Sequence, residues 1–272
     1  MIEYTIQTTL GRFRVKRETF IYRGEYKQDN LKVGGRNFCI EFKWHKDTPE
    51  SVELQWLDTA GGGCEIDGKI IRKELTIHLF DLAVSILKTQ TTVMYITLLD
   101  NSELTCELPR DKKGFIFIKY YYFLFHNVTW YDDKFNAYPK LEEERRQYES
   151  VKKNSGDPLK KPKAFDFKNN DLNTLFESIF ENSRTWQEFI DKIEPYSKED
   201  KCKYVFPWYM EAALILSDGK ALPMYWIIDA DSRPSIEYSK NVSGGGLRRL
   251  TSRKRKSNEI NLSEIRDLPY FH

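Results

Sequence analysis

The stretches "KELTIHLFDLAVSILK" (Lys73–Lys88) and "YITLLD" (Tyr95–Asp100) decide the expected fold. In the first, apolar residues recur at helical spacing and form one face, made by Leu75, Leu79, Leu82, Ala83, Ile86 and Leu87. The second is a short apolar run of the kind found in buried strands. We therefore expect a helix that packs through this face on a sheet containing Tyr95–Leu99.

The residues before this helix predict strands. "TIQTTLGRFRVKRETFIYRGEY" (Thr5–Tyr26) alternates in polarity, and "NFCIEFKW" (Asn37–Trp44) and "SVELQWL" (Ser51–Leu57) follow it. A loop is expected next at 58–69, because its glycines, Gly61, Gly62 and Gly63 among them, disfavour regular structure. This order predicts an α+β protein: a mixed sheet with helices, a smaller and mostly helical C-terminal lobe, and an extended tail.

An aromatic run, "GFIFIKYYYFLF" (Gly114–Phe125), is apolar on every side, so that a buried strand and a buried helix remain equally open. It leads into "TWYDDKF". Here Thr129 and Asp132 have the spacing of a helix N-cap and its third residue, which predicts that Trp130–Phe135 starts a short helix and that Pro139 ends it.

Four regions follow from these patterns and from the composition. A charged stretch, "LEEERRQYESVKKNSGDPLKKPKAF" (Leu141–Phe165), separates two apolar parts of the chain and predicts a solvated helix with a connector. Helices are expected near Leu172–Phe180, Thr185–Ile193 and Tyr204–Ser217, then a strand at Ala221–Ala230. The predicted domains are a core at 1–140, a connector at 141–168, a helical lobe with a strand at 169–243, and a basic docking tail at 244–272.

Composition and motifs exclude several classes of function. The net charge of +2 gives no overall field that would steer the protein onto nucleic acid. No histidine spacing of a metal site, Walker loop, GxSxG elbow or CxxC pair is present, so that no metal or cofactor is expected. Without an export signal or an apolar run long enough for a membrane span, we expect an intracellular protein, not a secreted one, whose four cysteines are reduced thiols.

The strand, glycine loop, helix, strand "YITLLDNS" and "TWYxxxFxA" segment together carry a family resemblance. Their order over Asn37–Pro139 resembles uncharacterised proteins of nucleocytoplasmic large DNA viruses, and through them the GCN5-related N-acetyltransferase fold. The resemblance implies acetyl-coenzyme A as cofactor, with Gly61, Gly62 and Gly63 near its pyrophosphate and Tyr131 as general acid. However, ten or more residues separate the glycines from the helix, so the phosphate-binding register of that family is missing.

The last residues carry the strongest functional signal. A hinge of glycines, Gly244–Gly246, precedes a basic cluster and apolar anchors: Arg248, Arg249, Arg253, Lys254, Arg255 and Lys256, then Leu268, Tyr270 and Phe271. Charge with aromatic anchors is typical of a docking peptide. The sequence thus predicts a non-enzymatic structural protein, a minor capsid or virion component that binds other protein subunits through its tail. An acetyltransferase is the first alternative, and a nucleic-acid-binding factor acting through the basic tail is the second.

Overall fold

The computed structural model describes residues 1–57, 64–70, 74–108, 112–155, 170–206, 209–217 and 219–241. Its strands are β1 (Ile2–Thr8), β2 (Gly11–Tyr22), β3 (Glu25–Gly34), β4 (Phe38–Trp44), β5 (Ser51–Leu57), β6 (Glu65–Ile66), β7 (Lys69–Ile70), β8 (Tyr95–Leu99), β9 (Glu103–Leu108), β10 (Lys112–Phe117), β11 (Tyr138–Pro139), β12 (Tyr225–Asp229) and β13 (Ser239–Asn241). Its helices are α1 (Glu74–Lys88), α2 (Ile118–His126), α3 (Trp130–Phe135), α4 (Glu142–Ser155), α5 (Asn170–Glu181), α6 (Trp186–Glu199), α7 (Lys201–Tyr204) and α8 (Tyr209–Leu216), with a 3₁₀ turn at Ala230–Ser232.

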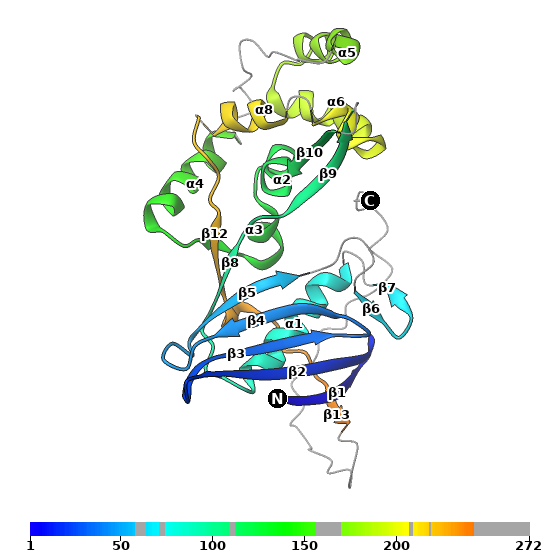
Figure 1. The fold of residues 1–272 in the computed structure, drawn as a ribbon. Helices are drawn as coiled ribbons and strands as arrows, with labels where there is room; N and C mark the ends of the chain where they lie inside the picture. The colour runs from blue at the N-terminus through cyan, green and yellow to red at the C-terminus, as the bar shows by residue number, and fades with distance from the viewer. Residues whose placement is uncertain are drawn as a thin grey trace.

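Nine of the described strands form one mixed sheet in the order β11-β12-β8-β5-β4-β3-β2-β1-β13 (Figure 1). The β5–β8 pair is parallel, and each other pair is antiparallel. Parallel neighbours need a crossover connection, and α1 provides it. The predicted α+β class is confirmed.

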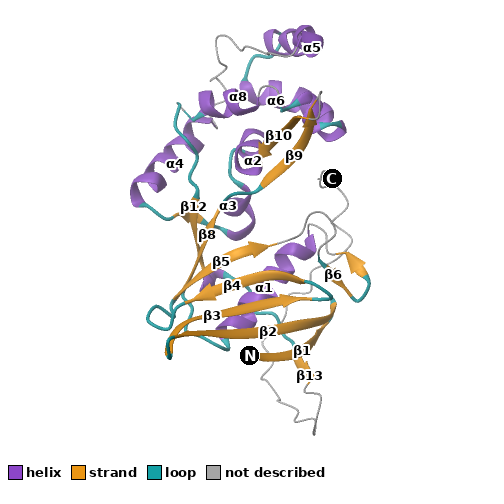
Figure 2. Cartoon of the chain, in the orientation of Figure 1, coloured by secondary structure: helices purple, strands orange, loops and turns teal. Residues whose placement is uncertain are grey.

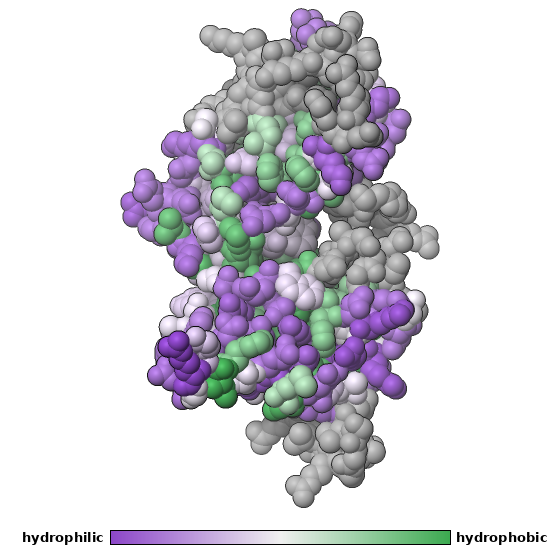
Figure 3. Space-filling model, viewed as in Figure 1, coloured by the Kyte–Doolittle hydropathy of each residue, from purple (hydrophilic) through white to green (hydrophobic). Residues whose placement is uncertain are grey.

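Helix α1 packs on the sheet through the face that its sequence predicts. Leu79, Leu82 and Ile86 are fully buried, and Phe80 meets Phe42 of β4 edge to face with 5.9 Å between ring centroids. The expected packing against a sheet that contains β8 is therefore confirmed. In Figure 2 helix α1 lies behind the sheet, and Figure 3 shows that the side facing the viewer is largely hydrophilic with some apolar residues.

Ion pairs run across that polar side of the sheet. Lys32 contacts both Glu18 (3.1 Å) and Glu41 (3.5 Å), and Lys16 contacts Glu18 at 2.7 Å. These residues alternate with the buried side chains along their strands, which is the pattern of a sheet with one solvated face.

The aromatic run Gly114–Phe125 is neither one strand nor one helix. Its first part belongs to β10, which pairs with β9, and α2 begins at Ile118. Pairing with Glu103–Leu108 satisfies the backbone of the first half, whereas the second half satisfies its own backbone as a helix. The next predicted helix, α3, is confirmed, but it ends earlier than expected: Asn136, in the left-handed conformation with φ 53°, caps it ahead of Pro139.

Helices from the middle of the chain gather beyond one end of the sheet, and β8 and β12 extend toward them (Figure 1). Tyr148 of α4 packs edge to face on Trp226 of β12, at 5.1 Å. Strands β12 and β13 come from the C-terminal half of the described chain, yet both lie in the main sheet, β12 beside β8 and β13 beside β1. The strand predicted at Ala221–Ala230 is thus confirmed as β12.

The expectation of reduced cysteines is wrong. Cys39 is bonded to Cys64, and Cys106 to Cys202, across 25 and 96 residues of sequence. The first disulfide ties β4 to the short β6–β7 hairpin, which occupies part of the predicted glycine loop. The spacing of the cysteines does not predict these disulfides, because the bonded partners are far apart in the sequence and come together only on folding.

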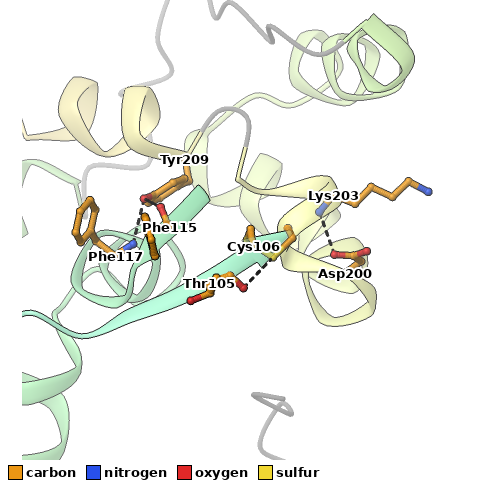
Figure 4. Close-up of a disulfide and its surroundings, with 8 residues drawn as sticks. Thr105, Cys106, Phe115, Phe117, Asp200, Lys203 and Tyr209 are labelled. Carbon is orange, nitrogen blue, oxygen red and sulfur yellow. Dashed lines mark hydrogen bonds between the residues drawn. A yellow bond between two sulfur atoms is a disulfide. The ribbon is translucent and has the colours of Figure 1, made fainter. Parts of the chain in front are cut away.

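The second disulfide joins the β9–β10 hairpin to α7 (Figure 4). On the other strand of the hairpin, the Tyr209 hydroxyl of α8 donates to the Phe115 carbonyl (2.8 Å) and accepts from the Phe117 N–H (3.1 Å). These are the backbone groups that a further strand would bind, so Tyr209 closes this edge of the hairpin. Cys202 of α7 and Tyr209 of α8 therefore hold one strand of the hairpin each.

Candidate functional site

The "TWYDDKF" motif begins with a helix cap, as its sequence predicts. The Thr129 side chain accepts a hydrogen bond from the Asp132 N–H at 3.4 Å, and the Thr129 N–H donates to the Tyr148 hydroxyl at 2.8 Å. Phe135 is fully buried and lies 4.4 Å from Phe80 of α1 and 5.1 Å from Trp130, measured between ring centroids. The aromatic residues of the motif thus anchor α3 in the core.

Both aspartates of the motif have partners within the protein. Asp132 accepts from the Tyr148 hydroxyl and from Lys152, each at 3.0 Å, and so links α3 to α4. Asp133 accepts from the Tyr122 hydroxyl of α2 and pairs with Lys134 at 2.6 Å. The burial of Tyr122 and its contact with Asp133 raise the pKa of this tyrosine. The motif therefore joins three helices.

A buried polar cluster lies next to the motif, where β8 ends. It consists of Asp100, Ser102, Lys119 and Tyr131; Asp100 is 4% exposed, Lys119 6% and Tyr131 8%. The Asp100 carboxylate accepts the Ser102 N–H at 3.3 Å, and the Ser102 and Tyr131 hydroxyls are 3.3 Å apart. Asp100 and Ser102 lie in the loop between β8 and β9, Lys119 in the first turn of α2 and Tyr131 in the first turn of α3.

Burial shifts the ionisation of the whole cluster. It raises the pKa of Asp100 to about 6, although the Ser102 hydrogen bond and the positive charge of Lys119 oppose the rise. It also lowers the pKa of Lys119, against the attraction of Asp100. The pKa of Tyr131 rises to about 12, through burial and then through the nearby Asp100. A carboxyl group that titrates near neutral pH can act as a proton donor or acceptor.

The cluster lies beside a fork in the sheet. The parallel pairing of β5 with β8 covers Ser51–Leu54 and stops at the Leu54–Leu98 pair. Beyond it β5 continues to Leu57 with a register shift against β4, and the two strands diverge in Figure 1. The carboxyl ends of two parallel strands thus separate where Asp100 and Tyr131 lie.

Of the residues singled out in the sequence, Tyr131 is the one that this cluster contains. Gly61, Gly62 and Gly63 lie outside the described residues, as do the basic cluster and the apolar anchors of the tail. Asp100 and Lys119 were not selected from the sequence. The only signal for Asp100 was its place directly after an apolar strand, and Lys119 looked like an interruption of an aromatic run.

Three charged residues at the end of β12, Asp229, Asp231 and Arg233, interact within the protein. Asp229 accepts the Asp231 N–H at 2.8 Å and caps the 3₁₀ turn. Arg233 instead forms an ion pair with the buried Asp81 of α1, with 2.7 Å between the Arg233 Nη2 and Asp81 Oδ1 atoms. These residues connect the end of β12 to α1.

Within the described ranges, no group of three or more His, Cys, Asp and Glu side chains is placed to hold a metal ion. No helix in this part of the chain is long and apolar enough to cross a membrane. Comparison of the sequence and structure with protein-family models, curated proteins and solved structures gives no match.

Proposed function

We propose that the chain is a non-enzymatic structural or interaction protein, a minor capsid or virion component of a large DNA virus that docks through its C-terminal tail. The observation that carries this proposal is the internal pairing of the "TWYDDKF" motif. Its aspartates bind Tyr122, Lys134, Tyr148 and Lys152, and its aromatic rings pack in the core. A motif used in this way builds a rigid body and leaves few of its groups for a substrate.

The disulfides support the same function. Disulfides persist at virion surfaces and in other oxidising surroundings, whereas cytosolic proteins usually keep their thiols reduced. Cys39, Cys64 and Cys106 are almost fully buried, so that the bonds are part of the folded body. A protein that spends time in assembled particles outside the host cytosol gains stability from such links.

The tail is the proposed docking element, and its test separates charge from apolar anchors. One variant replaces the six basic residues of Arg248–Lys256 by Gln, and another replaces Leu268, Tyr270 and Phe271 by Ser. A third ends at residue 243. Recovery in assembled particles and thermal unfolding are measured for each variant beside the intact chain.

We expect the truncation and the anchor variant to lose incorporation while their unfolding temperature stays within a few degrees of the intact chain. The basic-residue variant should slow incorporation, since charge steers the encounter. Normal incorporation of the truncated chain would refute the tail as the docking element. Loss of incorporation in the basic-residue variant alone, together with strongly salt-dependent DNA binding by the intact chain, would favour the nucleic-acid-binding alternative.

An N-acetyltransferase that uses acetyl-coenzyme A is the second candidate. The observation that favours it is the fork between β5 and β8 with Tyr131 and Asp100 beside it, in the order of strand, helix, strand and motif that the family resemblance implies. In this candidate Tyr131 donates a proton to the thiolate of coenzyme A as it leaves. The ionisation state of Asp100 determines the charge next to Tyr131.

Calorimetric titration with acetyl-coenzyme A tests this candidate. The structural proposal expects no heat of binding up to millimolar cofactor. Micromolar binding that Gly62→Val or Gly63→Val weakens would establish the acetyltransferase and overturn the structural proposal. If the cofactor binds, Tyr131→Phe should lower the rate of acetyl transfer and leave the affinity for the cofactor unchanged.

A further inference from the structure

The end of the β2–β3 hairpin carries three consecutive large apolar residues. Phe20, Ile21 and Tyr22 are 44%, 66% and 59% exposed. The register against β3 shifts between Phe20 and Ile21, where β3 has one extra residue, Lys27. Successive side chains of β2 still point to opposite faces, so Phe20 and Tyr22 lie on one side of the hairpin and Ile21 on the other. Figure 3 shows apolar surface beside strongly polar surface where β2 and β3 join. The tip of the hairpin is therefore apolar on both sides.

A tight turn closes this tip. Tyr22 pairs with Glu25, and the two residues between them, Arg23 and Gly24, both have positive φ values, 52° and 81°. This is the geometry of a type I′ turn, which matches the twist of the two strands. Glycine suits such positions, whereas an arginine is disfavoured there. The Arg23 guanidinium lies 5.2 Å from the centre of the Tyr22 ring.

The size of the tip argues against a protein partner. A stable protein interface needs about 800 Å² from each partner, which three residues do not supply. A flat partner would also leave one side of the hairpin in water. A lipid bilayer needs no complementary shape, and it surrounds a thin projection on both sides.

The composition of the tip also fits a bilayer interface. Tyrosine and arginine keep their polar ends at the level of the headgroups while their apolar parts are buried. The hairpin end carries charged residues of both signs, Arg23, Glu25 and Lys27. We propose that the Phe20–Tyr22 tip, with Arg23 at its apex, inserts into the interfacial layer of a lipid bilayer.

This binding is separate from the docking of the tail. One inserted tip gives weak and reversible attachment, as a single acyl chain does. Many copies held in one particle would bind a membrane strongly, since the second and later contacts become intramolecular.

Co-sedimentation of the full chain with vesicles of pure phosphatidylcholine tests the proposal. These vesicles carry no net charge, so the basic residues of the tail contribute little. We expect partitioning at millimolar lipid that falls about tenfold or more when Phe20, Ile21 and Tyr22 are all changed to Thr, a residue that keeps strand propensity. Ile21→Thr alone should lower it a few-fold.

Ile2→Thr is the matched control, because Ile2 is also a strand isoleucine and is 61% exposed. It should bind as the unchanged chain does, and circular dichroism should show the same fold for all variants. Absence of binding by the unchanged chain would overturn the proposal. So would equal binding by the triple variant, an equal loss in Ile2→Thr, or binding that requires phosphatidylserine and disappears in high salt.

Discussion

Replacing Asp100 with Asn should remove a large part of the pH dependence of the protein's stability. Asp100 is 4% exposed, and burial raises its pKa to about 6 from 3.8. At about 1.4 kcal/mol for each pH unit, this rise corresponds to about 3 kcal/mol. The attraction of Lys119 for the ionised carboxylate is already part of the pKa of about 6.

The sign of the effect follows from where the proton is held. Between about pH 4 and pH 6 the folded protein keeps the Asp100 proton, whereas the unfolded chain has lost it. The contribution of Asp100 to the free energy of unfolding therefore falls as pH rises through this window, and the full cost is present above it. Asparagine does not ionise and keeps an oxygen that can accept the Ser102 N–H.

Urea unfolding of both proteins from pH 4 to pH 8, followed by tryptophan fluorescence, measures the effect. The free energy of unfolding of Asp100→Asn minus that of the unchanged protein should rise by about 2 kcal/mol between pH 4 and pH 7, because the carboxyl group of the unfolded chain is already more than half ionised at pH 4. Asp47→Asn, at an exposed aspartate, controls for the change of residue type. If this difference in the free energy of unfolding stayed constant over the range, Asp100 would ionise as it does in water. The raised pKa of Asp100 would then be refuted.

Three other changes probe the packing of α1 on the sheet and the links that hold the β9–β10 hairpin. Leu79→Ala should cost about 2–5 kcal/mol in chemical unfolding, because Leu79 is fully buried between α1 and the sheet; a cost near that of a surface change would refute this packing. Changing Cys106 and Cys202 together to Ala should lower the free energy of unfolding by about 2–5 kcal/mol, because the disulfide closes a long loop. Equal stability of this variant and the oxidised protein would contradict a stabilising role of the disulfide. Tyr209→Phe should lower the free energy of unfolding by about 1–3 kcal/mol. It should also speed hydrogen exchange of the Phe117 N–H, which loses its acceptor. Unchanged exchange would show that other groups protect the edge of β10.

The local patterns of the sequence were sufficient for several elements. The periodicity of α1 and the alternation in β2 and β4 predict both the element and its buried face, because spacing alone determines which side chains share a side. Thr129 predicts the start of α3 for the same reason: the cap and the N–H that it binds are three residues apart. Strand β3 was missed, since Asp29 and Asn30 are rare in strands, yet both are buried there. Pairing with β2 and β4 on its two sides outweighs their low propensity.

Only the tertiary structure decided the features that join distant parts of the chain. The aromatic run divides into β10 and α2 because β9 pairs with its first half. Four cysteines alone leave three possible pairings. Cys106 bonds to Cys202 because folding brings α7 next to the β9–β10 hairpin. Asp100 comes from the loop after β8, and Lys119 and Tyr131 come from two helices; their altered pKa values arise mainly from burial, which no spacing in the sequence expresses. The sequence by itself determines the periodicity of helices and strands and the helix caps, because these depend on residues close together in the chain. The burial of side chains and the pairing of strands and cysteines depend on residues that only folding brings close.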